Sequence, residues 1–164
     1  MLNWFSQSPQ SDSVVITGAS TGIGAACALA LDKLGYRVFA GVRHSADGER
    51  LQQQAGPRLM PIRLDVTDAA SISAASHTVA AMVGERGLAG LVNNAGIGVA
   101  GPIELLPLAD WRRQFEVNVF GLIAVTQTFL PLIRTGRGRI INMGSIAGRA
   151  SMPFMAPYAA SKHA

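Results

Sequence analysis

A tyrosine and a lysine lie four residues apart in the segment "PYAASK", at Tyr158 and Lys162. Pro157 suits the first turn of a helix, and residues four apart share one helical face, so both side chains would point the same way. A phenol with an ordinary pKa of about 10 exchanges protons poorly near neutral pH unless a nearby cation favours its ionised form. The pair therefore indicates proton transfer to or from a substrate oxygen; the alternative is a solvent-facing pair on an ordinary helix.

A glycine-rich segment, "TGASTGIG" at residues 17–24, follows the β-branched run "SVVI" and precedes an apolar helical pattern. Gly18, Gly22 and Gly24 allow the backbone to turn tightly and to approach a phosphate group at a helix N-terminus. A glycine triplet by itself suits a plain turn equally well. Its position between a strand and a helix favours a site for nucleotide phosphates.

Asn118 lies in the middle of an apolar helical pattern, seven residues after Trp111 and four before Leu122. An amide buried there without a hydrogen-bond partner would cost about 1–3 kcal/mol. The side chain therefore needs a partner, which is either neighbouring backbone or another polar group of a site.

Alternating strands and helices must position these residues. Short apolar or β-branched runs predict strands at 13–18, 36–42, 58–66, 87–96 and 137–145. Apolar periodicity between them predicts helices at 23–35, about 46–55, 68–83 and about 111–129. This alternation predicts an α/β fold, a doubly wound parallel sheet in three α/β/α layers, with function at the carboxyl ends of the strands. We expect residues 1–12 to form a flexible tail and 13–164 to form one domain.

Composition argues against several other classes of protein. The net charge is +4, but the arginines are scattered without interleaved aromatic residues, which argues against nucleic acid as a partner. Cys27 and the three histidines lack partners at metal-ligand spacing, so we expect no metal site. The charge-free run 117–133 is interrupted by polar residues and Pro131, so we expect no membrane span. The N-terminus lacks the features of a signal peptide, so we expect a cytoplasmic protein.

Four motifs occur together in one order: "TGASTGIG", "NNAG" at 93–96, "MGS" at 143–145 and "YAASK" at 158–162. In order and approximate spacing they resemble the short-chain dehydrogenase/reductase family, from about residue 13 to the end of the chain. The resemblance implies a Rossmann-like domain and an NAD(P)-dependent enzyme that interconverts an alcohol and a carbonyl by hydride transfer. The substrate would be a small alcohol or ketone, and the apolar stretch before Tyr158 suggests a hydrophobic one.

The resemblance assigns the catalytic roles to four residues. Tyr158 would be the general acid or base, and Lys162 would lower its pKa and hold the nicotinamide ribose. Ser145 would donate a hydrogen bond to the substrate oxygen, although a serine at a strand end also suits a turn. Asn118 would be linked to Lys162 through water, with neighbouring backbone as the alternative partner.

The resemblance also implies a set of cofactor contacts. Asp65 would accept a hydrogen bond from the adenine amino group, although it also suits a helix start. Asn93 would face the cofactor, although asparagines there also suit a left-handed turn. The full set is Gly18, Ser20, Thr21, Gly22, Ile23, Gly24, Arg43, Asp65, Val66, Asn93, Ala95, Gly96, Tyr158 and Lys162.

The end of the second predicted strand bears on the choice of cofactor. NAD-specific sites place a carboxylate there for the ribose 2′-hydroxyl, whereas an arginine accepts the 2′-phosphate of NADP. Val42 takes the place of the acid and Arg43 follows it, which favours NADP(H). NAD(H) stays open, because Thr21 stands where many NADP-using members carry a basic residue, and Asp47 and Glu49 lie near.

The chain ends within the helix that carries Tyr158 and Lys162, whereas members of the family continue with a sixth and a seventh strand. We therefore expect a truncated chain with little or no turnover alone, and a homo-oligomer in the full-length form. Residues 157–164 are too few for a stable isolated helix, so we expect Lys162 to be poorly held. The alternatives to an enzyme are a non-catalytic dinucleotide-binding module and an interaction domain without cofactor.

Overall fold

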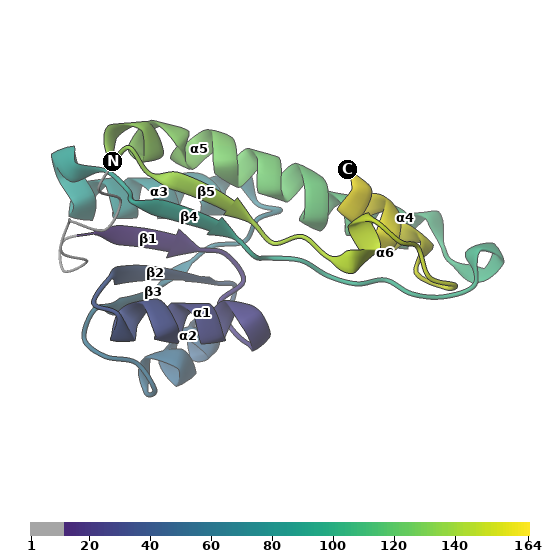
Figure 1. The fold of residues 1–164 in the computed structure, drawn as a ribbon, viewed down its shortest axis with the longest axis horizontal. Helices are drawn as coiled ribbons and strands as arrows, with labels where there is room; N and C mark the ends of the chain where they lie inside the picture. Colours follow the sequence, from purple (N-terminus) through teal and green to yellow (C-terminus); the bar gives the residue numbers. More distant parts are fainter. Residues whose placement is uncertain (1–11) are drawn as a thin grey trace, which may run out of the picture.

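The computed structural model describes residues 12–164 and contains one parallel sheet of five strands (Figure 1). The strand order is β3-β2-β1-β4-β5, in which the chain winds outward from β1 in both directions. The strands are β1 (Ser13–Ile16), β2 (Arg37–Val42), β3 (Leu59–Arg63), β4 (Gly90–Asn93) and β5 (Arg139–Asn142). The predicted doubly wound α/β fold is confirmed.

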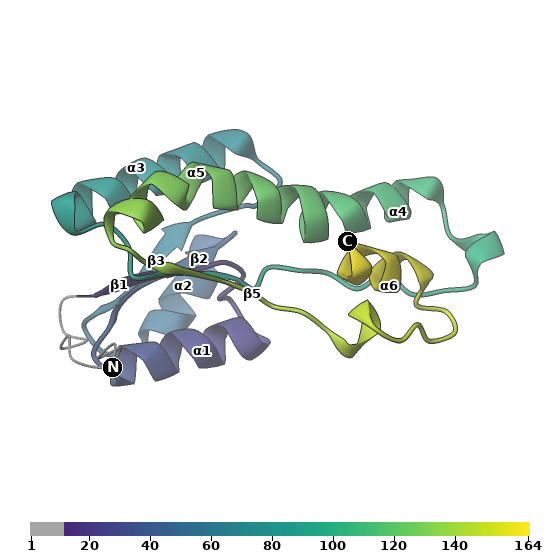
Figure 2. The same cartoon turned by 45° about the horizontal axis from the view of Figure 1, so that its top comes forward.

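Helices cover both faces of the sheet (Figure 2). On one face lie α1 (Gly22–Lys33) and α2 (Ser45–Gln52), and on the other lie α3 (Ala69–Val83) and α5 (Leu122–Thr135). Successive strand residues point to opposite faces. Val15 therefore packs with Phe129 in the core under α3 and α5, whereas Val14 packs with Ala28 in the core under α1.

The buried face of the first helix does not follow its apolar pattern. Ile23 and Leu34, which the apolar pattern of the helix predicted at 23–35 puts on one face, are 62% and 65% exposed, and α1 buries Gly24 and Ala28 instead. These small residues allow the helix to lie close to the sheet, so the contact face follows residue size as well as hydrophobicity. Cys27, on the same helix, is half-buried.

A continuous helical stretch, Leu108–Thr135, contains α4 (Leu108–Phe115), a π-helical segment η4 (Glu116–Gly121) and α5. It is long and apolar enough to cross a membrane by length and composition alone, contrary to the expectation drawn from its polar interruptions. Val125 and Phe129 on α5 are fully buried against the sheet, whereas 28% of the most apolar window of the stretch is buried.

The last helix, α6 (Ala156–His163), lies beside α4 beyond the carboxyl edge of the sheet (Figures 1 and 2). It also packs against the 3-10 turn η5 (Ile146–Gly148), and Ala159 and Ser161 are buried. Lys162 donates a hydrogen bond from Nζ to the carbonyl of Met143 at 2.8 Å. The expectation that this lysine is poorly held is therefore wrong, because tertiary packing stabilises a helix too short to be stable alone.

The strand β5 pairs with β4 on one side and forms an edge of the sheet on the other. All four of its residues are exposed, including Ile140 and Ile141. At the start of the described chain, Asp12 already accepts a backbone hydrogen bond from Arg37. The rest of the expected N-terminal tail lies outside the described residues.

Candidate functional site

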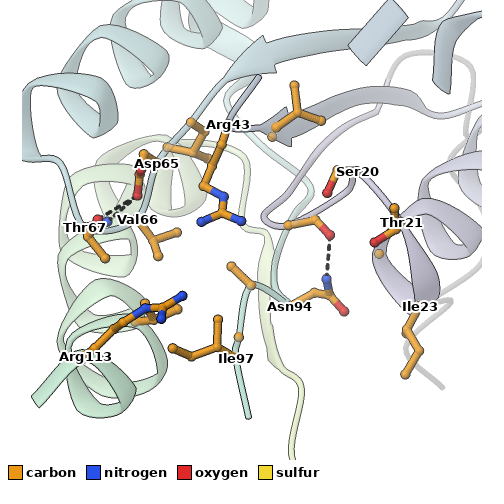
Figure 3. Close-up of a pocket in the computed structure, with 18 residues that line it drawn as sticks. Ser20, Thr21, Ile23, Arg43, Asp65, Val66, Thr67, Asn94, Ile97 and Arg113 are labelled. Carbon is orange, nitrogen blue, oxygen red and sulfur yellow. Dashed lines mark hydrogen bonds between the residues drawn. The ribbon is translucent and has the colours of Figure 1, made fainter. Parts of the chain in front are cut away.

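A cavity of about 450 Å³ opens at the carboxyl ends of the strands, between the loops that follow β1, β2, β3 and β4 (Figure 3). The chain winds away from β1 in opposite directions there, and this reversal is where doubly wound sheets bind ligands. The cavity is lined by Gly18, Ser20, Thr21, Ile23, Gly24, Gly41, Val42, Arg43, Leu64, Asp65, Val66, Thr67, Asn94, Ala95, Gly96, Ile97, Arg113 and Val117.

The glycine loop after β1 has the backbone geometry that the sequence predicts. Gly18 has φ +65°, and a Cβ there would lie 2.8 Å from Cα of Ala95. A Cβ on Gly24 would overlap the carbonyl oxygen of Gly18 and the side chain of Asn94. Thr21, the N-cap of α1, makes no side-chain capping hydrogen bond. The first turn of α1 therefore presents backbone N–H groups that suit the phosphates of a dinucleotide.

Two polar residues join the glycine loop to the loop after β4. Thr17 accepts hydrogen bonds at Oγ1 from the backbone N–H groups of Asn94 and Ala95, at 3.0 and 2.9 Å. Asn94 donates from Nδ2 to the carbonyl of Thr17 and to that of Gly18, each at 3.0 Å, and Figure 3 shows the second of these bonds. These bonds fix one wall of the cavity, so the loop does not have to be ordered by a ligand.

Asp65 and Val66 lie on the opposite wall, after β3 (Figure 3). The Asp65 carboxylate accepts hydrogen bonds from the backbone N–H and the hydroxyl of Thr67, at 2.9 and 2.8 Å. Partial burial raises the pKa of Asp65, but these hydrogen bonds and the charges of Arg43 and Arg63 outweigh it, so the pKa lies below its ordinary value. An ionised carboxylate suits an amino-group donor such as that of adenine.

The Arg43 side chain extends into the cavity from the end of β2 (Figure 3). Asp47, one of the two acids that kept NAD open, pairs with Arg50 on α2. Glu49, the other acid, lines a separate hollow beside α2 that also includes Arg43. Arg43 is thus the charged side chain that the end of β2 contributes to the cavity.

The structure brings most of the predicted cofactor residues to this cavity, and Gly22 starts the helix beside it. Three others, Asn93, Tyr158 and Lys162, do not line it. Asn93 is buried, and its Nδ2 donates to Thr126 Oγ1 and Asn142 Oδ1, both at 2.9 Å. Strand alternation turns the Asn93 side chain away from the cavity, where it joins β4 to β5 and α5. Asn94 forms the cavity wall instead.

The predicted catalytic residues gather beside the cavity, on α6 and the loop after β5. Tyr158 and Lys162 share one face of α6, with the lysine Nζ 6.0 Å from the centre of the tyrosine ring. Ser145 comes just before η5, which packs on α6, and its Oγ accepts a hydrogen bond from Ala147 N at 3.2 Å. Neither Tyr158 nor Lys162 lines the cavity itself.

The side chain of Asn118 is buried and makes three hydrogen bonds. Its Oδ1 accepts from Ile97 N at 2.9 Å, and its Nδ2 donates to Ile97 O at 3.0 Å and to Ser161 Oγ at 3.1 Å. The two bonds to Ile97 correspond to the backbone alternative, and the bond to Ser161 joins Asn118 to another polar side chain. The water link to Lys162 stays a prediction.

Sequence reasoning missed a second buried amide, Gln114, one helical turn before Asn118. It accepts from Val99 N and donates to Ile97 O, each at 2.7 Å, and donates to Ser161 Oγ at 3.3 Å. The spacing of four between two amides on an apolar helix face was the available signal. Arg113, which also lines the cavity, gave no such signal.

Comparison with known proteins agrees with this geometry. The family model described as short chain dehydrogenase matches residues 12–164, which is the whole described chain. The chain belongs to this family. Human 17-beta-hydroxysteroid dehydrogenase type 2 is 42% identical over 154 residues, covering 92% of this chain and 40% of that protein. Mouse retinol dehydrogenase 5 is 43% identical over 143 residues, covering 86% of this chain and 45% of that protein.

Solved structures of short-chain dehydrogenases share the fold. A gluconate 5-dehydrogenase from Burkholderia cenocepacia J2315, in complex with NADP and tartrate, superposes with a TM-score of 0.82 at 31% identity. The match covers 93% of this chain and 60% of that one. A short-chain dehydrogenase from Streptomyces avermitilis has a TM-score of 0.84 at 33% identity, covering 93% of this chain and 56% of that one. This chain spans about half the length of the relatives that it matches.

Proposed function

We propose that this chain is the cofactor-binding and catalytic-motif portion of an NADP(H)-dependent oxidoreductase that interconverts a carbonyl and an alcohol. The observation that carries the proposal is a hydrogen-bonded connection between the two parts of the site. Ile97 lines the cavity and bonds to Asn118, whose amide also bonds to Ser161 on the helix of Tyr158. The proton-transfer residues are thereby held at the edge of the dinucleotide cavity.

The cavity fits the parts of a dinucleotide. The glycine loop and the first turn of α1 offer backbone N–H groups for the pyrophosphate. Asp65 suits the adenine amino group, and Arg43 suits a 2′-phosphate. A bound nicotinamide would supply or accept hydride. The relative solved with NADP supports the choice of cofactor class.

Three residues carry the proton chemistry of this proposal. Tyr158 donates a proton to the carbonyl oxygen during reduction and accepts it back during oxidation. Lys162 lies on the same helical face, with its Nζ 6.0 Å from the centre of the Tyr158 ring, and would hold the nicotinamide ribose. Ser145 donates a hydrogen bond to the substrate oxygen and orients it. Ser161 accepts from Asn118 and donates to the Tyr158 carbonyl at 2.8 Å, so it holds the helix in place.

We propose a hydrophobic substrate alcohol or ketone. Ile146, Met152 and Phe154, between Ser145 and Tyr158, are strongly exposed and can form an apolar surface beside the reacting oxygen. The relatives named for hydroxysteroids and retinol act on ligands of this kind, which supports the same class here. The apolar body of the substrate would contribute binding, and its one oxygen would contribute the chemistry.

The test is NADPH consumption by the full-length gene product with a panel of hydrophobic ketones. We expect turnover that Tyr158→Phe lowers by at least about 100-fold, the usual contribution of general acid–base catalysis, without loss of NADPH binding. The second tyrosine of the chain, Tyr36, provides the matched control, and Tyr36→Phe should leave turnover unchanged. Binding without turnover in the unaltered protein would favour the non-catalytic dinucleotide-binding module instead.

A further inference from the structure

Arg113 lies on α4 and lines the cavity on the wall across from the glycine loop (Figure 3). Val117, four residues later on the same helical stretch, lines it as well. The position of this wall is fixed, because the intervening Gln114 is fully buried and hydrogen-bonds to the backbone of Ile97 and Val99. The Arg113 side chain therefore extends from a rigid element.

The charge of Arg113 is not compensated inside the cavity. Among residues 12–164 its side chain makes no hydrogen bond or ion pair with another residue. The acidic residue of the cavity lining is Asp65, and the cations that act on its carboxylate are those of Arg43 and Arg63. A free guanidinium on a cavity wall is available for a ligand.

The neighbours of Arg113 indicate which part of a ligand it would contact. Val66, Ile97 and Val117 are its apolar neighbours in the cavity lining, and Asp65 and Thr67 lie further along the same wall (Figure 3). The backbone donors suited to phosphates lie across the cavity, in the loop before α1. A planar guanidinium above an apolar wall favours an aromatic ring, which it can stack against, over a phosphate.

We propose that Arg113 is a cofactor-binding residue that stacks its guanidinium against the adenine ring of the dinucleotide. This inference rests on the proposed function and adds to it a contact to the adenine ring, which NADP and NAD share. Arg43 and Arg113 then have separate tasks. Arg43 selects the 2′-phosphate, and Arg113 holds the purine whichever cofactor is present.

The experiment is fluorescence titration of the chain with NADPH and NADH, and competition by 5′-AMP. Arg113→Ala should weaken the binding of all three by a similar factor, about 3-fold to 30-fold. Arg113→Lys should resemble Arg113→Ala, because a lysine keeps the charge but has no planar group to stack. Circular dichroism of each variant checks that the fold is intact.

Arg112 supplies the matched control. It is the neighbouring arginine on the same exposed helix, but it lines a different groove with Trp111 and Phe115. Arg112→Ala should leave all three affinities unchanged. If Arg113→Ala behaves like Arg112→Ala, or if Arg113→Lys restores binding, the stacking role is overturned while the proposed function stands. If the unaltered chain binds neither dinucleotide, the proposed function and this inference both fail.

Discussion

The side-chain amide of Asn118 donates a hydrogen bond to the hydroxyl of Ser161 at 3.1 Å, across 43 residues of sequence. Ser161 in turn donates to the carbonyl of Tyr158 on α6. The π-helical segment η4 contains Asn118, and such segments are frequent at functional sites. The placement of the tyrosine therefore depends on a buried amide of another helix.

Replacing Asn118 by leucine should destabilise the domain by about 1–3 kcal/mol, because the N–H of Ile97 would lose its partner and the C=O of Ile97 would keep only Gln114. Urea unfolding measures the change. Gln127→Leu, at an exposed amide of α5, is the matched control and should change the unfolding free energy by less than about 0.5 kcal/mol. Equal effects of the two variants would contradict a structural role for the Asn118 amide.

Gly24→Ala should abolish dinucleotide binding, because the added Cβ would overlap the Gly18 carbonyl and the Asn94 amide. Gly22→Ala is the informative comparison. Its Cβ would meet no atom within 4 Å, and the cost is limited to the left-handed backbone at φ +58°, about 1–2 kcal/mol. Titration with NADPH should separate the two variants, and retained affinity in Gly24→Ala would show that the loop does not form the site.

The pKa of Asp65 is lowered in the folded chain, so its charged form stabilises the fold. This contribution is present above the unfolded pKa of about 4 and disappears as the pH falls through the lower folded pKa. Asp65→Asn should therefore reduce the unfolding free energy at pH 7 and have progressively less effect below about pH 4. Glu85→Gln, at an exposed carboxylate at the far end of β4, serves as the control, and a pH-independent loss in Asp65→Asn would contradict this assignment.

The edge strand β5 should promote self-association of the 164-residue chain, because Ile140 and Ile141 are exposed beside unpaired backbone groups. Ile141→Lys should shift the chain toward monomer in sedimentation velocity. Ile23→Lys removes an even more exposed isoleucine that lies on α1 and not on an edge, and it should have no such effect. If both substitutions act equally, association follows general surface hydrophobicity and does not depend on the edge.

Sequence reasoning predicted the elements whose signals are local. The β-branched run before the glycine loop predicted β1, and the apolar periodicity of 68–83 predicted α3, which buries Ile72, Ala75 and Val79. Sequence reasoning failed where side-chain packing determines which face of a helix is buried. The buried face of α1 is set by the close approach of Gly24 and Ala28 to the sheet. The pattern of large apolar residues along the helix does not reveal this approach.

The same distinction holds for the site. Arg43, Asp65 and the glycine loop follow strand ends, where a doubly wound fold collects ligand-binding residues, and they do line the cavity. Asn93 and Asn94 could not be told apart, because a difference of one residue at the strand end decides which of them faces the cavity. Gln114 and Ser161 meet only through tertiary structure, across 47 residues.

The central claim is that this cavity binds NADP(H) through Arg43. The most direct measurement is fluorescence titration with NADPH and NADH, in the 164-residue chain and in the full-length gene product, for the unaltered protein and for Arg43→Ala. The account predicts tighter binding of NADPH than of NADH, and loss of that preference in the variant. Absence of binding for both nucleotides, or an unchanged preference in Arg43→Ala, would contradict it.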